Sequence, residues 1–288
     1  MWHLKKIPNT AHFYWGNDTI SFLRYLTVAS FTKFNPGWKI KLYYPKAKYQ
    51  GEKTWYADVR YCNFRGNNYR DKLFGMKNIE KKEVDFGQLG FNHDIPENYK
   101  ADFLRWKVLS IEGGLFSDMD IIYFRPIESL YFNKKINENI NTVVCINEDN
   151  DPPFHSVGFL MSSPNNNFYK FLHQKSYAEP NLLEYQSMGP DLPNTFFRTP
   201  ISIKNQFPGI NLHNIKMEAV YPLRDGQLAS IYQSNDLSRI TYETIGLHWY
   251  AGHPNSTRWE NIITENNYKK IDNVLCKTIG RVIRSQRT

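Results

Sequence analysis

Cysteine is scarce in this chain, and long hydrophobic runs are missing from it. The three cysteines among 288 residues, Cys62, Cys145 and Cys276, are too few and too scattered for a disulfide framework or a zinc site. No apolar stretch approaches the length of a membrane span, and the opening Met-Trp-His-Leu-Lys-Lys lacks the hydrophobic region of a signal peptide. We therefore expect a protein of the reducing cytoplasm.

Acidic residues are outnumbered by basic ones, 28 against 36, so the chain carries a net charge of +8. Nucleic acid is not the expected partner, because no helix-turn-helix, zinc finger or RNP-type aromatic motif is present. An anionic small molecule or an anionic lipid also suits the charge. The basic tail 270–288 is either a solvated terminal helix or an amphipathic helix in peripheral contact with the inner face of a membrane. It combines Lys277, Arg281, Arg284 and Arg287 with Ile279, Val282 and Ile283.

Aromatic residues, by contrast, make up 16% of the chain, which predicts a packed core rather than disorder. We interpret residues 1–288 as a single domain. Strands are expected at 12–15 and 38–44, on either side of a helix over 19–34. This order of strand, helix and strand opens a nucleotide-binding α/β fold. The polar, weakly periodic stretch 46–98 is expected to be a helical or looping insertion.

The most informative stretch is 101–120. Apolar residues at helical spacing predict a helix up to Ile111, and Gly113-Gly114 supplies the left-handed conformation that commonly ends a helix. A short buried strand follows, and Asp118 and Asp120 come directly after it. Because alternate residues share a strand face, both carboxylates can face one way. Two hard oxygen ligands at the mouth of an α/β sheet suit a divalent cation that carries a diphosphate.

A plainer interpretation of each residue stays open at this point. An isolated Asp-x-Asp most often lies in an ordinary loop and binds nothing. Asp102 suits the N-cap of the predicted helix as well as it suits a binding site. Trp15, taken alone, is more typical of a core residue than of a ligand contact.

Longer motifs favour a functional interpretation. The block from Asp102 to Asp120 resembles the sugar-nucleotide-binding DXD region of glycosyltransferase family 32 and its relatives, which include the glucosylating domains of large clostridial toxins. Residues 7–16 are similar to the first strand of the same enzymes, and 246–259 resembles the closing motif of retaining transferases. The resemblance implies a GT-A fold, a Rossmann-like α/β fold that binds nucleotide sugars on a central mixed sheet with helical insertions.

The resemblance implies a cation site and a nucleotide-sugar site. The cation would be held by Asp118, Asp120 and His248, with His253 as the alternative histidine. An imidazole ligand favours Mn²⁺, and Mg²⁺ is the alternative. The residues implied in binding the nucleotide sugar are Trp15, Gly16, Asp102, Arg105, Asp118, Ser256 and Trp259.

Within that set, the resemblance assigns separate tasks. Trp15 would stack on the base, and Arg105 would contact the diphosphate and the sugar, since its planar fork suits phosphate oxygens. Asp102 would accept hydrogen bonds from sugar hydroxyls. The candidates for catalysis are Asp102, Arg105 and Asp191, the last of them near the anomeric carbon or simply in a turn. The stretch 251–259 is expected to be a mobile loop that closes over the donor.

These implications lead to one hypothesis and two alternatives. The hypothesis is a metal-dependent, retaining glycosyltransferase that moves a hexose from a nucleotide-diphospho-sugar, with a UDP-sugar as first choice, to a polysaccharide, glycolipid or protein acceptor. The first alternative is a metal-dependent phosphotransferase or nuclease, although two-metal sites need more carboxylates than these motifs supply. The second is a non-catalytic carbohydrate-binding relative.

Overall fold

The computed structural model describes residues 7–51, 64–90, 95–131, 139–178 and 184–285. Cys62, Arg287 and the first six residues, which entered the sequence analysis, lie outside this range. Cys145 and Cys276 are buried as thiols. No helix in the described ranges is long and apolar enough to cross a membrane.

The described elements alternate between strand and helix over residues 10–117, and further along the chain they come mostly in runs of strands and of helices. The strands are β1 (Thr10–Tyr14), β2 (Lys39–Pro45), β3 (Ile79–Val84), β4 (Gly114–Ser117), β5 (Ile121–Tyr123), β6 (Thr142–Val144), β7 (Ile146–Asn147), β8 (Phe154–His155), β9 (Phe159–Ser162), β10 (Leu212–Asn214) and β11 (Gly246–His248). The α-helices are α1 (Phe22–Phe34), α2 (Arg70–Phe74), α3 (Glu97–Ile111), α4 (Asn167–Ala178), α5 (Asp191–Phe196), α6 (Pro200–Gln206), α7 (Leu228–Gln233), α8 (Pro254–Ile262) and α9 (Val274–Arg284). Short 3₁₀ helices cover Ile127–Tyr131, Met217–Ala219, Asp225–Gln227 and Tyr268–Lys270.

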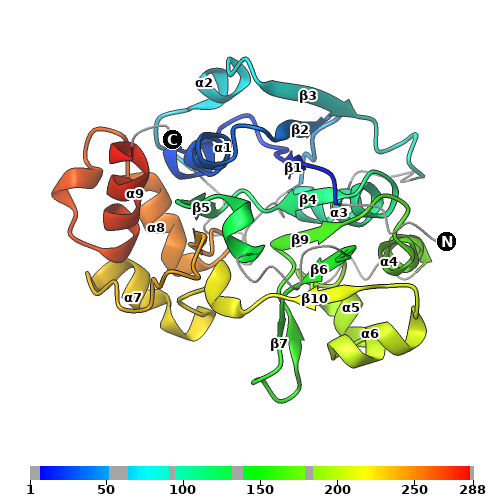
Figure 1. Cartoon of the computed structure of the whole chain (residues 1–288). Helices are drawn as coiled ribbons and strands as arrows, with labels where there is room; N and C mark the ends of the chain where they lie inside the picture. Colours follow the sequence, from blue (N-terminus) through cyan, green and yellow to red (C-terminus); the bar gives the residue numbers. More distant parts are fainter. Residues whose placement is uncertain (1–6, 52–63, 91–94, 132–138, 179–183, 286–288) are drawn as a thin grey trace.

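A seven-stranded sheet in the order β10-β6-β9-β4-β1-β2-β3 lies at the centre of the molecule, with helices on both sides (Figure 1). Strand β9 runs antiparallel to both of its neighbours, and the remaining pairs are parallel. The predicted α/β class with a central mixed sheet is therefore confirmed. Because β1 and β4 are adjacent and parallel, the residues that follow them lie at the same edge of the sheet.

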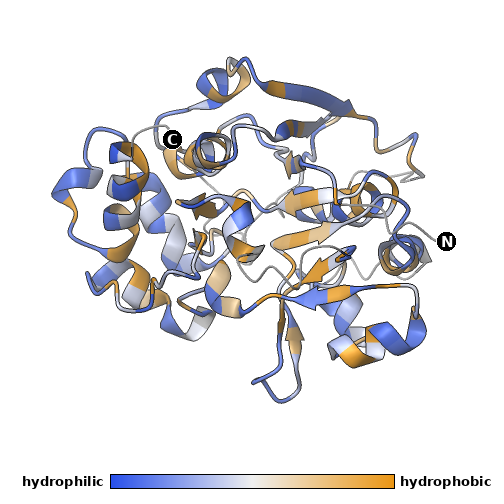
Figure 2. Ribbon diagram, in the orientation of Figure 1, coloured by the Kyte–Doolittle hydropathy of each residue, from blue (hydrophilic) through white to orange (hydrophobic). Residues whose placement is uncertain are grey.

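Successive residues of the central strands pack into two separate cores, one on each face of the sheet. Phe13, Leu115 and Phe159 join the core formed with α1, α7 and α9. Their neighbours Tyr14, Phe116 and Leu160 join the core formed with α3, α4 and α5. Burial on both faces explains why these strands are hydrophobic along their length, as the colouring of the central strands in Figure 2 shows.

Helix α3 starts earlier than the sequence indicates. It begins at Glu97 instead of residue 101, so Asp102 lies inside the helix and the interpretation of Asp102 as an N-cap is wrong. Apolar spacing gave no signal for the first turn, because its residues are polar although they are buried. The predicted end is confirmed: Gly113 and Gly114 have φ angles of +68° and +93°.

The stretch 46–98 also differs from the prediction of a helical or looping insertion. Residues Ile79–Val84 form β3, which pairs in parallel with β2 at the edge of the central sheet. Its sequence, Ile-Glu-Lys-Lys-Glu-Val, is mostly polar because an edge strand keeps solvent on much of its surface. Hydrophobic patterning therefore could not reveal it.

The basic tail contains α9, which packs against α7, β5 and the 3₁₀ helix Tyr268–Lys270 (Figure 1). Ile279 and Val282 are buried in the core, and Lys33 Nζ donates a hydrogen bond of 2.6 Å to the carbonyl oxygen of Val282. Ile283, with 45% of its surface exposed, lies outside that core. Two of the three apolar residues considered for membrane contact therefore face the protein interior.

We expect His12, on β1, to make the folded state sensitive to acid. Its Nε2 lies 2.9 Å from the carbonyl oxygen of Gly113, which only accepts, so Nε2 is the donor and Nδ1 accepts from the Tyr43 hydroxyl at 3.0 Å. Burial lowers the pKa of His12 from 6.5 to about 4, against a smaller upward effect of Glu112. The unfolded chain therefore binds more protons between pH 4 and 6.5, so this stabilisation is present above pH 6.5 and is lost as the pH falls towards 4.

The measurement is the free energy of unfolding between pH 4 and 7 for the wild type and for His12→Gln, whose amide does not titrate there. One proton contributes a slope of up to about 1.4 kcal/mol per pH unit. The slope should become shallower in His12→Gln, and identical slopes would contradict the assignment.

Candidate metal and nucleotide-sugar site

Asp118, Asp120 and His248 converge at the end of β4. Asp118 follows β4 directly, and Asp120 precedes β5. Strand β11 pairs antiparallel with β5 in a register that sets His248 opposite Ile121, so the histidine arrives beside Asp120. Each of the three side chains offers a ligand atom within 4.8 Å of the others, and this is the one cluster of its kind in the part of the chain that the structure describes.

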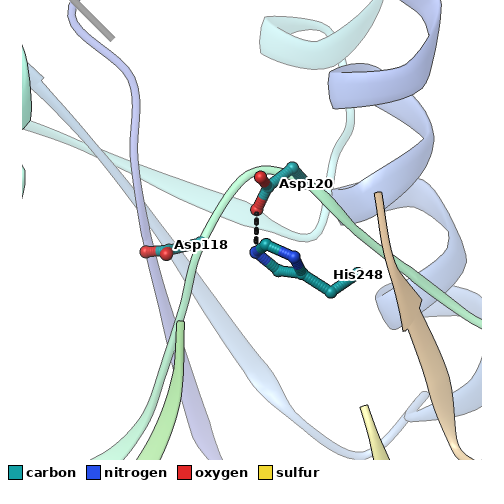
Figure 3. Close-up of side chains that lie close together, drawn as sticks. All are labelled: Asp118, Asp120 and His248. Carbon is teal, nitrogen blue, oxygen red and sulfur yellow. Dashed lines mark ion pairs between the residues drawn. The ribbon is translucent and has the colours of Figure 1, made fainter. Parts of the chain in front are cut away.

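The oxygens of Asp120 differ in their surroundings. Oδ2 accepts a hydrogen bond of 2.9 Å from the backbone N–H of Ala251. Oδ1 is buried without a hydrogen bond, although it lies 3.1 Å from His248 Nε2 in an ion-pair contact (Figure 3). Burial raises the pKa of Asp120, but His248, Arg24 and the Ala251 N–H together outweigh it and lower the pKa. An ionised oxygen without a hydrogen bond fits a cation ligand.

Arg105 joins two aspartates that belong to different elements. Its guanidinium donates to Asp102 within α3 and to Asp118 after β4. The arginine side chain is only 3% exposed, and its Nε is buried without a hydrogen-bond partner. Burial lowers the pKa of Arg105, yet the charges of Asp118 and Asp102 outweigh it, so the group stays charged. The Nε–H of the charged Arg105 guanidinium is therefore available to donate a hydrogen bond to a ligand.

The carboxylate of Asp102 lies between Arg105 and the backbone at Gly189. Burial raises its pKa to about 7, against the opposing charge of Arg105 and with help from the like charge of Asp118. A Cβ added to Gly189 would lie 2.9 Å from Asp102 Oδ2, so the chain around Gly189 approaches the carboxylate as closely as glycine allows. Asp191 is the first residue of α5, two positions further on, and burial together with Glu184 raises its pKa.

These side chains line one cavity of about 350 Å³. Its wall includes Asp102, Arg105, Asp118, Asp120, His248, Arg24, Tyr14, Tyr185, Tyr221 and Tyr250, together with 154–158 and 251–253. Asp191 is not part of the lining, whereas its neighbour Pro190 is. The cavity therefore unites the predicted cation ligands with Asp102 and Arg105.

Trp15 lies beside this cavity without lining it. Its side chain is 4% exposed, its Nε1 donates to the carbonyl oxygen of Thr19 at 2.9 Å, and the Arg24 guanidinium stacks 4.2 Å from its ring centre. The next residue, Gly16, is in close contact with the Glu97 side chain. Stacking of Trp15 on a base stays a prediction, and it requires that Arg24 or its surroundings move.

We predict that Trp15→Ala weakens the binding of UDP or GDP by about 1–3 kcal/mol, the range for losing one base stack. Calorimetry with the free nucleotide measures this directly. The control is Trp38→Ala, which removes a tryptophan of the same core that packs on Phe31 and bonds Glu128. Equal nucleotide affinity of the wild type and Trp15→Ala would make Trp15 a core residue only.

The stretch 251–259 is largely helical, which corrects the expectation of a loop. Helix α8 begins at Pro254, and the His253 side chain caps it by accepting a hydrogen bond of 3.1 Å from the Asn255 N–H. Ser256 is fully buried and bonds the Trp249 carbonyl, while Trp259 stacks on Tyr232 with ring centres 5.5 Å apart. Proline at the first helical position and this capping histidine favour a helix here.

The cavity also contains residues that sequence reasoning missed. Arg24 is buried between the rings of Trp15 and Trp249, and it forms an ion pair with Glu260 of α8 at 2.6 Å. Tyr221 packs on the His248 ring, with centres 4.9 Å apart. Neither residue stands in a local motif, because each owes its place to partners far away in the sequence.

Part of the chain matches a family of known proteins. Residues 4–141 match the family model described as "Glycosyltransferase sugar-binding region containing DXD motif". The match is to glycosyltransferases. It covers Trp15, Asp102, Arg105 and both aspartates of the Asp-Met-Asp sequence, and it supports sugar transfer as the general activity. No curated protein matches the chain.

Among solved structures, similarity extends over most of the chain at low identity. The glycosyltransferase PaToxG is 17% identical over 96% of this chain and 87% of its own, with a TM-score of 0.44. The galactosyltransferase LgtC, solved with donor and acceptor sugar analogues, is 14% identical over 91% of this chain and 100% of its own, with a TM-score of 0.44. Mouse xyloside xylosyltransferase 1 is 11% identical over 85% and 98%, also with a TM-score of 0.44.

Proposed function

We propose that the protein is a metal-dependent, retaining glycosyltransferase of the GT-A type that moves a hexose from a nucleotide-diphospho-sugar to an acceptor. One observation carries the proposal. Asp118, Asp120 and His248 meet Arg105 in a single cavity, and the aspartates and the arginine belong to the region that matches glycosyltransferases.

Asp118, Asp120 and His248 would hold the cation, with Mn²⁺ as first choice because of the imidazole and Mg²⁺ as the alternative. A cation held there would supply Lewis-acid stabilisation of the charge that develops on the departing diphosphate. Arg105 would add a positive charge at the same place, and its unbonded Nε–H suits a phosphate oxygen. Asp102 would accept hydrogen bonds from the hydroxyls of the donor sugar.

Retention of configuration fits the way the carboxylates of the cavity are already engaged. In the described lining of the cavity, the carboxylates are Asp102, Asp118 and Asp120. Arg105 bonds the first two, and Asp120 belongs to the cation cluster. Without a spare carboxylate, a phosphate oxygen of the donor would take the proton of the acceptor hydroxyl. Asp191 stays a candidate for a group near the anomeric carbon, since it contributes to the electrostatics of Asp102.

A UDP-sugar is the proposed donor, and a polysaccharide, a glycolipid or a protein side chain is the proposed acceptor. The test is a screen of nucleotide sugars for release of nucleoside diphosphate, with Mn²⁺ and with a chelator. We expect one donor to be hydrolysed only with Mn²⁺, and the anomer of the released sugar, read by NMR, to match that of the donor. No Mn²⁺-dependent release from any donor, with or without added glycan acceptors, would contradict the proposal.

A further inference from the structure

Tyr221 carries a hydroxyl that the fold buries without using. The residue follows the 3₁₀ helix Met217–Ala219, is 4% exposed and lines the cavity. Its oxygen has no hydrogen-bond partner among the described residues. Burying a polar group without a partner costs folding free energy, so an unused hydroxyl at the wall of a binding cavity requires an explanation.

One polar group close to this hydroxyl is the carboxylate of Asp118. A Cβ added to Gly158 would lie 2.8 Å from the Tyr221 hydroxyl and 2.9 Å from Asp118 Oδ2, so both oxygens border the same narrow space. The Gly158 carbonyl also accepts a hydrogen bond of 2.8 Å from the Asp118 N–H, which fixes the backbone on both sides of that space. The tyrosine ring is itself held against His248.

Asp118 is the member of the cation cluster that has room to turn. Its side chain is 31% exposed, whereas that of Asp120 is 11% exposed. Its Oδ1 is engaged by Arg105, and Figure 3 shows its carboxylate directed to one side while Asp120 and His248 face each other. Of the three residues, Asp118 is therefore the one that can most readily adjust its carboxylate to a shared cation.

We propose that Tyr221 is a positioning residue, whose hydroxyl donates a hydrogen bond to the Asp118 carboxylate when Asp118 turns to a cation shared with Asp120 and His248. This inference rests on the proposed function. Carboxylate ligands of metals are generally oriented by such outer partners, whose loss costs about 10–100-fold in metal affinity. Gly158 is then required as glycine, because a side chain there would separate the two groups.

The experiment compares the wild type with Tyr221→Phe by titration with Mn²⁺ alone, followed by electron paramagnetic resonance, and by thermal unfolding without metal. We expect the Mn²⁺ affinity to fall about 10–100-fold. The melting temperature should be unchanged or higher, since the variant loses no hydrogen bond of the metal-free protein and removes a buried polar atom. The control is Tyr169→Phe, because the Tyr169 hydroxyl donates to the Val143 carbonyl at 3.1 Å. It should lower the melting temperature and leave Mn²⁺ affinity unchanged.

Each other outcome overturns the inference in a recognisable way. Equal Mn²⁺ affinity in the wild type and Tyr221→Phe would remove any role of the hydroxyl at the cation. Unchanged Mn²⁺ affinity with weaker UDP binding would mean that the hydroxyl contacts the donor instead of Asp118. A loss of Mn²⁺ affinity together with a lower melting temperature would indicate a structural role. A wild type that binds no Mn²⁺ would contradict the proposed function itself.

Discussion

Replacing Asp120 by asparagine is expected to abolish metal-dependent turnover while leaving the fold intact. The substitution removes the charge of an oxygen that lies in the cation cluster without a hydrogen bond. The loss should exceed the about 10–100-fold that outer partners of a metal ligand contribute. The asparagine oxygen can still accept from the Ala251 N–H, so the turn after His248 keeps its anchor.

Donor hydrolysis at limiting Mn²⁺ and the melting temperature are the two readouts. Asp149→Asn is the matched control, because the Asp149 side chain is 81% exposed and contacts only Arg224 among the described residues, at 3.4 Å. The control should keep full activity. Near-wild-type activity of Asp120→Asn at limiting Mn²⁺ would show that the metal assignment is wrong.

The second large effect is expected at the ion pair between α1 and α8. Glu260 Oε1 accepts from Arg24 Nε at 2.6 Å and from the Ser21 hydroxyl at 2.8 Å, and both charged side chains are at most 4% exposed. Glu260→Gln keeps the shape but leaves the buried guanidinium without this counter-charge. Removing one partner of a buried pair costs about 3–5 kcal/mol of folding free energy.

Denaturant unfolding of Glu260→Gln and of Glu265→Gln provides the comparison. Glu265 pairs with Lys72 at 2.7 Å, but both side chains are more than 40% exposed. Solvent screens such a pair, so its loss should cost about 0–1 kcal/mol. If the two variants lost equal amounts of stability, the account of Arg24 as a buried cation held by Glu260 would fail.

The sequence predicts those elements of the fold that depend on residues close together in the chain. The first strand, the first helix and the strand after it follow from apolar patterning between turn residues, and the structure has them as β1, α1 and β2. The turn at Gly113 follows from the backbone freedom of glycine. Strand β3 was not predicted, because a polar edge strand has no apolar pattern. The first turn of α3 was not predicted either, because buried polar residues cannot be told from surface residues in the sequence.

In the site, too, local patterns were predictable and contacts between distant parts of the chain were not. Alternation along a strand predicts that Asp118 and Asp120 lie together, while the arrival of His248 depends on the pairing of β5 with β11, which no local pattern encodes. Arg24 and Tyr221 were missed for this reason, since their partners lie far away in the chain. The helix at Pro254 was missed because small and polar residues favour a loop when their burial is unknown.

We propose above that Asp118, Asp120 and His248 hold a divalent cation that receives a nucleoside diphosphate. Calorimetric titration of the wild-type protein with UDP and with GDP, in Mn²⁺ and in a chelator, tests it most directly. We expect one of the two nucleotides to bind at least about tenfold tighter in Mn²⁺, a difference of about 1.4 kcal/mol or more. Equal affinity in Mn²⁺ and in the chelator, or no binding of either nucleotide, would contradict it.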